Sequence, residues 1–99
     1  MARVIIWSLR ATEDIESIAA YIAQDSEAYA MSVVRNILQK TRMLSEFPYI
    51  GRIVPEFDDE SIREIFAYSY RIIYQIQSND INVAAVIHGK RLLNTWFKP

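Results

Sequence analysis

The chain contains no cysteine and only one histidine. The absence of cysteine excludes a disulfide framework and a thiolate metal site, and it is consistent with a reducing compartment. A single histidine, without a cluster of His and Cys residues, leaves no ligand set for a structural zinc ion. We therefore expect a cytoplasmic protein that needs no metal and no other cofactor.

The sequence also lacks an excess of charge of either sign. Eleven lysines and arginines stand against twelve aspartates and glutamates, which gives a net charge of −1. This balance provides no broad cationic field for nucleic acid, so protein is the expected main partner. Charged residues interrupt the first 20 positions, at Arg3, Arg10, Glu13, Asp14 and Glu16. We therefore expect neither a signal peptide nor a membrane span there.

Length and apolar content together indicate one folded domain. The chain has 99 residues, of which 52% are hydrophobic, and this is enough for a single core. The apolar share lies slightly above the usual range. We predict one domain over residues 1–99, with some apolar surface that stays exposed until a partner covers it.

Hydrophobic periodicity predicts a strand and two helices in the first half. Residues 3–8 ("RVIIWS") are β-branched and aromatic, which is typical of a short strand. Residues 11–24 switch to helical spacing, with Thr12 as a cap candidate. Asp25 and Ser26 then cap a longer helix and make the connection short, which predicts an antiparallel hairpin. The apolar stripe predicted for the longer helix is Met31, Val34, Ile37, Leu38, Thr41 and Leu44.

A long connector and three strands follow in the second half. The connector, residues 46–61, is rich in turn-forming residues and suits a loop that cannot join a central strand. Its acidic run, residues 56–60, is expected to be solvated rather than metal-binding. Residues 62–67, 70–77 and 81–88 are strand-like. The predicted fold is α+β, in the order β-α-α-β-β-β, with the helical hairpin packed on one face of an antiparallel sheet.

Pairing of the last two strands predicts which side chains share a face. A two-residue turn at Asn79–Asp80 sets apolar positions opposite apolar positions. In this register Arg71 and His88 become cross-strand neighbours on the face away from the helices, which is left partly open. The face toward the helices is then Tyr70, Ile72, Tyr74, Ile76, Ile81, Val83, Ala85 and Ile87.

Four stretches in this order, "FPYIGRIVPEF", "IREI", "YRIIY" and "VIHGKRLL", resemble the RelE/ParE superfamily of bacterial type II toxin–antitoxin toxins. The resemblance covers essentially the whole chain, and residues 51–56 with His88-Gly89 look more like the ParE arm. It implies a toxin that inhibits DNA gyrase by binding and is neutralised by a cognate antitoxin in a hetero-oligomer. The antitoxin is expected to add a helix in a groove beside the sheet, with a strand on the sheet edge as a further option.

The RelE arm of the superfamily implies an alternative function, a ribosome-dependent mRNA endoribonuclease. RNA cleavage by transesterification needs a base, an acid and cations around the pentacovalent phosphate. The candidates are Arg71, His88 and Arg91, with Glu56 reaching in from the connector. Arg71 falls on the strand where RelE-type nucleases keep an important arginine. Such nucleases are strongly basic, however, whereas this connector carries a single cation, Arg52.

Other roles remain open for the same residues. His88 at a strand end is typical of a hydrogen-bonded surface group, and Arg71 beside Glu64 or Tyr68 fits an exposed cross-strand network. The candidate target-binding residues of a gyrase-binding toxin are Arg52, Lys90, Arg91, Trp96 and Phe97. The tail is included because its large rings usually need a surface to cover them. A third possible function is an inactivated toxin fold kept as a protein-binding subunit.

Overall fold

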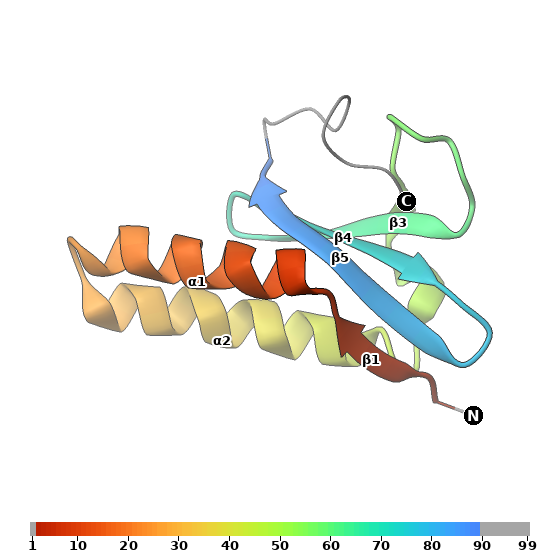
Figure 1. Cartoon of the computed structure of the whole chain (residues 1–99), viewed down its shortest axis with the longest axis horizontal. Coiled ribbons are helices and arrows are strands. Elements are labelled where there is room, and N and C mark those ends of the chain that lie inside the picture. The colour runs from red at the N-terminus through yellow and green to blue at the C-terminus, as the bar shows by residue number, and fades with distance from the viewer. Residues whose placement is uncertain (1, 90–99) are drawn as a thin grey trace.

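The computed structural model describes residues 2–89 as a helical hairpin packed against one face of a β-sheet (Figure 1). The predicted order of elements and the predicted layering are confirmed. The elements are β1 (Val4–Trp7), α1 (Leu9–Ala23), α2 (Glu27–Met43), the 3-10 helix η1 (Pro48–Ile50), β2 (Arg52–Ile53), β3 (Ile62–Ala67), β4 (Tyr70–Ile76) and β5 (Asp80–His88). None of the helices within residues 2–89 is long and apolar enough to cross a membrane.

The sheet has five strands in the order β1-β5-β4-β3-β2. Three of its neighbouring pairs are antiparallel, as predicted, but β1 runs parallel to β5, so the sheet is mixed. β2 is a two-residue edge strand within the predicted connector. Its edge position agrees with the expectation that the proline-containing connector does not enter the centre of the sheet.

Each of the two α-helices begins at a serine cap. The Ser8 hydroxyl accepts a hydrogen bond from the Ala11 backbone N–H, so α1 starts at Leu9 rather than near Thr12. The predicted cap Thr12 was wrong because Ser8, directly after β1, already satisfies the first turn. Ser26 accepts from the Tyr29 N–H and caps α2 as predicted.

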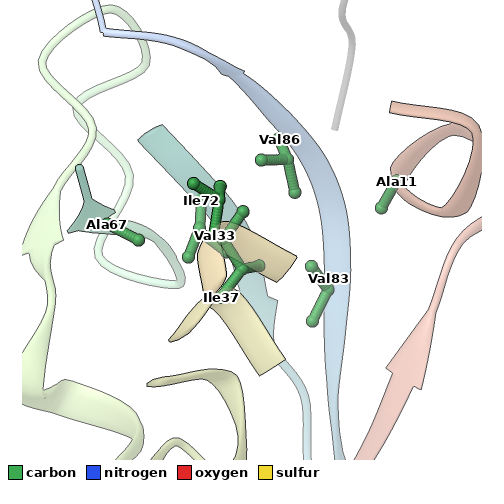
Figure 2. Packing of buried hydrophobic residues seen from close by; sticks show 7 residues of the cluster. All are labelled: Ala11, Val33, Ile37, Ala67, Ile72, Val83 and Val86. Atoms are coloured by element: carbon green, nitrogen blue, oxygen red, sulfur yellow. The ribbon is translucent and has the colours of Figure 1, made fainter. Parts of the chain in front are cut away.

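The main core lies between the helices and the sheet. It consists of Ala11, Val33, Ile37, Ala67, Ile72, Val83 and Val86. Figure 2 shows Val33 and Ile37 of α2 close to Ile72 of β4, with Val83 and Val86 projecting from β5. Interdigitation of these branched side chains fixes the distance between hairpin and sheet.

The buried stripe of α2 differs from the predicted one. Ile37, Thr41 and Leu44 are buried as expected, but Ala30 and Val33 take the other core positions. Met31, by contrast, is 61% exposed. The predicted stripe was therefore rotated by about one residue from the buried one, toward the larger side chains. Periodicity alone could not separate the face toward the sheet from the face beside α1.

The pairing of β4 with β5 contains a β-bulge that the sequence did not reveal. Tyr74 pairs with Val83 but Ile73 pairs with Ala85, so Ala84 is an extra residue on β5. The turn also lies one residue earlier than predicted, since the Gln77 N–H bonds to the Asp80 carbonyl. The predicted register was therefore wrong.

Polar side chains from the start of α1 stabilise this bulge. The Ser8 hydroxyl donates to the Ala84 carbonyl at 3.0 Å, and the Asp14 carboxylate accepts from the Val86 N–H at 2.9 Å. These two bonds satisfy backbone groups that the interrupted ladder leaves open. The bulge is thus encoded by residues about 70 positions away from it in the chain.

Beyond the bulge the two faces of β5 are exchanged. Ala85 and Ile87, predicted to face the helices, instead join a second core with Ile73 on the opposite face. Val54 and Phe57 of the connector pack on this second core. The opposite face is therefore covered there by the connector, and the prediction of an open face was wrong in this region.

Replacing Asp14 with alanine is expected to lower the free energy of unfolding by about 1–3 kcal/mol, because the Val86 N–H loses its acceptor. Asp14→Asn retains an acceptor oxygen and should cost less. Glu13→Ala, at an exposed neighbouring position, serves as the control and should change stability by less than about 0.5 kcal/mol. Urea denaturation measures all three. Equal values for Asp14→Ala and Glu13→Ala would contradict this role.

Candidate functional site

The most prominent polar arrangement is a cluster of two arginines and two glutamates on the second face of the sheet. Arg71 of β4 donates through Nε to Glu64 of β3 at 2.6 Å. Its Nη1 and Nη2 atoms both donate to the carboxylate of Glu56, at 2.8 Å each. Arg52 of β2 donates to the second oxygen of Glu64. We call these four residues the ion-pair cluster.

The ion-pair cluster is buried at its centre. The side chain of Arg71 is 5% exposed and that of Glu64 is fully buried. Hydrogen bonds to Glu56 and then to Glu64 raise the pKa of the Arg71 guanidinium, while burial acts in the opposite direction. The network predicted for Arg71 and Glu64 therefore exists, but it is buried rather than exposed. Bidentate geometry of this kind offsets the cost of removing the charges from water.

His88 does not belong to this cluster. It pairs across the strands with Tyr70, and their rings lie 6.0 Å apart in an edge-to-face arrangement. Since neighbouring residues of a strand point to opposite faces, Tyr70 and His88 share one face while Arg71 lies on the other. The predicted cross-strand pair of Arg71 and His88 is thus wrong, because the earlier turn and the bulge together shift the register, and the bulge turns His88 to the other face. The third nuclease candidate, Arg91, lies outside the described residues.

The predicted target-binding residues divide into two groups. Arg52 lies at the β2 edge with an exposed side chain, bonded to Glu64 and 5.2 Å from the centre of the Phe66 ring. The other candidates, Lys90, Arg91, Trp96 and Phe97, lie outside the described residues. Their role remains a prediction.

The acidic run of the connector is partly solvated and partly structural. Asp58, Asp59 and Glu60 are exposed, as expected, whereas Glu56 binds Arg71. The Asp59 carboxylate accepts two hydrogen bonds from Ser61, one from its hydroxyl and one from its backbone N–H. Both bonds lower the pKa of the Asp59 carboxyl, and the bond from the hydroxyl has the larger effect. Within residues 2–89 no group of three or more His, Asp or Glu side chains is arranged to hold a metal ion.

A groove between the two helices was missed by the sequence analysis. Its volume is about 580 Å³, and it is lined by Ala19, Ala20, Ala23, Glu27, Ala30, Met31, Val34, Arg35 and Leu38. The residues Met31, Val34 and Leu38 were assigned to the core because their spacing is helical. The alanine-rich stretch "IAAYIA" was the available signal, since small side chains on a helix face leave room for close approach.

The fold has counterparts among solved structures. It matches a solved structure titled "Chromosomal ParDE TA system from P. aeruginosa" with a TM-score of 0.72 and 14% identity, over 88% of this chain and 96% of that one. It also matches "The structure of YoeB dimer from Staphylococcus aureus" with a TM-score of 0.62 and 16% identity, over 89% and 98% of the two chains. At these identities the likeness concerns the fold alone.

Sequence comparison gives the family. The profile of the family described as "ParE toxin of type II toxin-antitoxin system, parDE" matches residues 5–93. The chain belongs to this family of toxins. A search of curated protein sequences gives no significant match. The predicted superfamily is confirmed, and an antitoxin as partner follows from membership of a toxin–antitoxin system.

Proposed function

We propose that this toxin inhibits DNA gyrase by binding it and does not cleave RNA. The observation that supports the proposal is that the guanidinium of Arg71 is engaged in hydrogen bonds within the protein. All three of its guanidinium nitrogens donate to the carboxylates of Glu56 and Glu64. An arginine that stabilises a pentacovalent phosphate must direct its donors at the substrate. Arg71 would have to release two bonds from Glu56 before it could do so.

The position of His88 also argues against a nuclease centre built from these residues. A general acid or base acts within hydrogen-bond reach of the group it serves, beside the charge that stabilises the transition state. Arg71 and His88 lie on opposite faces of the sheet. Inhibition by binding requires only a complementary surface, which is a smaller demand on the chain.

Two assays on the purified toxin test the proposal. The wild type is expected to abolish supercoiling by purified DNA gyrase and to leave mRNA intact on translating ribosomes. The variant His88→Ala, like the wild type, should leave mRNA intact. Cleavage of mRNA that His88→Ala abolishes would favour the ribonuclease alternative. Inactivity in both assays would favour the inactivated, protein-binding fold.

We propose that the groove between α1 and α2 receives a helix of the cognate antitoxin. Its alanines allow a partner backbone to approach closely, and Met31, Val34 and Leu38 provide apolar walls. Glu27 and Arg35 supply one charge of each sign, which would fix the direction of the incoming helix. An amphipathic helix with apolar residues at spacings of three and four fits this surface.

The variant Ala20→Glu is expected to weaken antitoxin binding by at least about tenfold, because it places a charge in the apolar groove. Ala20 is exposed, so the thermal stability of the free toxin should not change. Ala28→Glu is the matched control, since Ala28 is also exposed but does not line the groove. Isothermal titration calorimetry with the antitoxin encoded beside the toxin gene measures both. Equal affinities of the two variants would place the antitoxin helix elsewhere.

A further inference from the structure

Aromatic side chains from α1, α2, β4, β5 and the β3–β4 turn gather near one end of the molecule. Tyr29 of α2 lies edge-to-face with Tyr68 of the β3–β4 turn at 5.9 Å, and Tyr70 of β4 lies in the same way against His88 of β5. Burial raises the pKa of Tyr70, and the charges of Tyr29 and Tyr21 add to this effect. Figure 1 shows the β3–β4 turn and the end of β5 on the side toward which the helical hairpin projects. We use the name tyrosine patch for five residues, which are Tyr21, Tyr29, Tyr68, Tyr70 and His88.

The tyrosine patch is exposed although its rings are large. Tyr21 is 70%, Tyr29 49% and Tyr68 52% exposed. Tyrosine is enriched among the residues that dominate protein–protein binding energy, because it buries a wide ring and keeps a hydroxyl for hydrogen bonding. Several such rings side by side on a small chain therefore indicate a contact surface.

The backbone of Tyr68 gives a second and independent indication. Its φ is 56°, in the left-handed region, within the two-residue turn that joins Ala67 to Tyr70. Glycine or asparagine is preferred at such a position, and an aromatic residue there carries a conformational cost. Strained residues of this kind concentrate at functional sites, where the side chain is needed for another purpose.

The charges next to the patch indicate the kind of partner. Two exposed carboxylates lie between Tyr21 and Tyr29 in the chain. Asp25 is in the turn between the helices, and Glu27 is the first residue of α2. Of the described cations, Lys40 and Arg71 come near the β3–β4 turn. The Lys40 ammonium group donates to the Phe66 carbonyl, and the Arg71 guanidinium donates to the carboxylates of the ion-pair cluster. Ring faces beside carboxylates attract guanidinium and ammonium groups and disfavour the phosphates of a nucleic acid.

We infer that the tyrosine patch is the surface with which this toxin contacts its target protein, at a segment that carries arginine or lysine. The inference rests on the proposed action on a protein target, and it deepens that proposal by naming the contacting surface. This surface adjoins the helical groove at Glu27, but none of its five rings lines the groove.

Substitution of Tyr68 separates a binding role from a structural one. Tyr68→Gly and Tyr68→Asn remove the ring and relieve the left-handed backbone, so the melting temperature should stay the same or rise. The same variants should bind gyrase about 30-fold more weakly and lose growth arrest when produced in bacterial cells at matched soluble levels. Tyr68→Phe keeps the ring and should retain both activities. Tyr49→Asn, at an exposed tyrosine outside the patch, is the control.

Each outcome decides the inference. Loss of both activities with retained antitoxin binding supports it, together with the proposed function. The wild type could arrest growth without inhibiting gyrase. If Tyr68→Gly then abolishes the arrest, the result supports the patch as the target-contacting surface and overturns gyrase as the target. Retained arrest in Tyr68→Gly, a wild type that causes no arrest, or a loss confined to antitoxin binding overturns the patch. Saturable binding of an oligouridine that Tyr68→Gly abolishes would overturn the assignment of a protein partner.

Discussion

Replacing Arg71 with alanine is expected to lower the free energy of unfolding by about 3–5 kcal/mol. The substitution removes three hydrogen bonds to carboxylates and leaves Glu64, whose side chain is fully buried, with Arg52 as its remaining arginine. Glu56 also loses the partner that ties the connector to β4. Urea denaturation of the purified chain, followed by far-UV circular dichroism, measures the loss.

Matched variants of the ion-pair cluster control this prediction. Arg52→Ala removes the exposed partner of Glu64 and should cost no more than about 1 kcal/mol. The double variant Arg71→Met with Glu64→Leu replaces the buried pair by apolar groups and should recover part of the loss, because the fully buried Glu64 carboxylate is removed with its partner while Glu56 still lacks its arginine. A loss for Arg71→Ala as small as that for Arg52→Ala would contradict a buried structural role.

A second large loss of stability is expected for Gly51→Ala, of about 2–4 kcal/mol. A Cβ atom at Gly51 would lie 2.5 Å from the Tyr74 hydroxyl and 2.6 Å from the Glu64 carbonyl oxygen. The backbone of Gly51 is in the ordinary extended region, so the cause is lack of space rather than an unusual φ. The Tyr74 hydroxyl is itself required, since it donates to the Pro48 carbonyl and accepts from the Gly51 N–H.

A double-mutant cycle with Tyr74→Phe separates the two contacts. Tyr74→Phe alone should cost about 1–3 kcal/mol, because it leaves buried backbone groups of Pro48 and Gly51 without their partner. In the phenylalanine background Gly51→Ala should cost less, but the Glu64 carbonyl still opposes the new methyl group. Additive costs would contradict the proposed contact with the hydroxyl, and so would a Gly51→Ala variant as stable as the wild type.

The parts of the fold that the sequence predicted are those specified by local patterns. Helical spacing, strand alternation and the cap at Ser26 each depend on residues close together in the chain. The register of β5 failed because its bulge is stabilised by Ser8 and Asp14, which precede it by about 70 residues. The prediction of the buried stripe of α2 failed because this helix has apolar residues both toward the sheet and toward α1, and helical spacing does not distinguish these two faces.

The candidate site shows the same division between local and distant causes. Pairing of Arg71 with Glu64 was foreseen, since both lie on adjacent predicted strands. Its burial was not, because it depends on Glu56 in a connector without regular spacing. The separation of Arg71 from His88 followed from the bulge. The groove between the helices was not predicted, because alanines line much of it and their small side chains give no strong periodic signal.

Inhibition of gyrase is tested by supercoiling of relaxed plasmid by purified DNA gyrase with increasing amounts of this toxin. We expect loss of supercoiled product in proportion to the toxin added, and full recovery when the cognate antitoxin is present in excess. Undiminished supercoiling by gyrase, in the presence of a toxin that cleaves mRNA on translating ribosomes, would contradict this expectation.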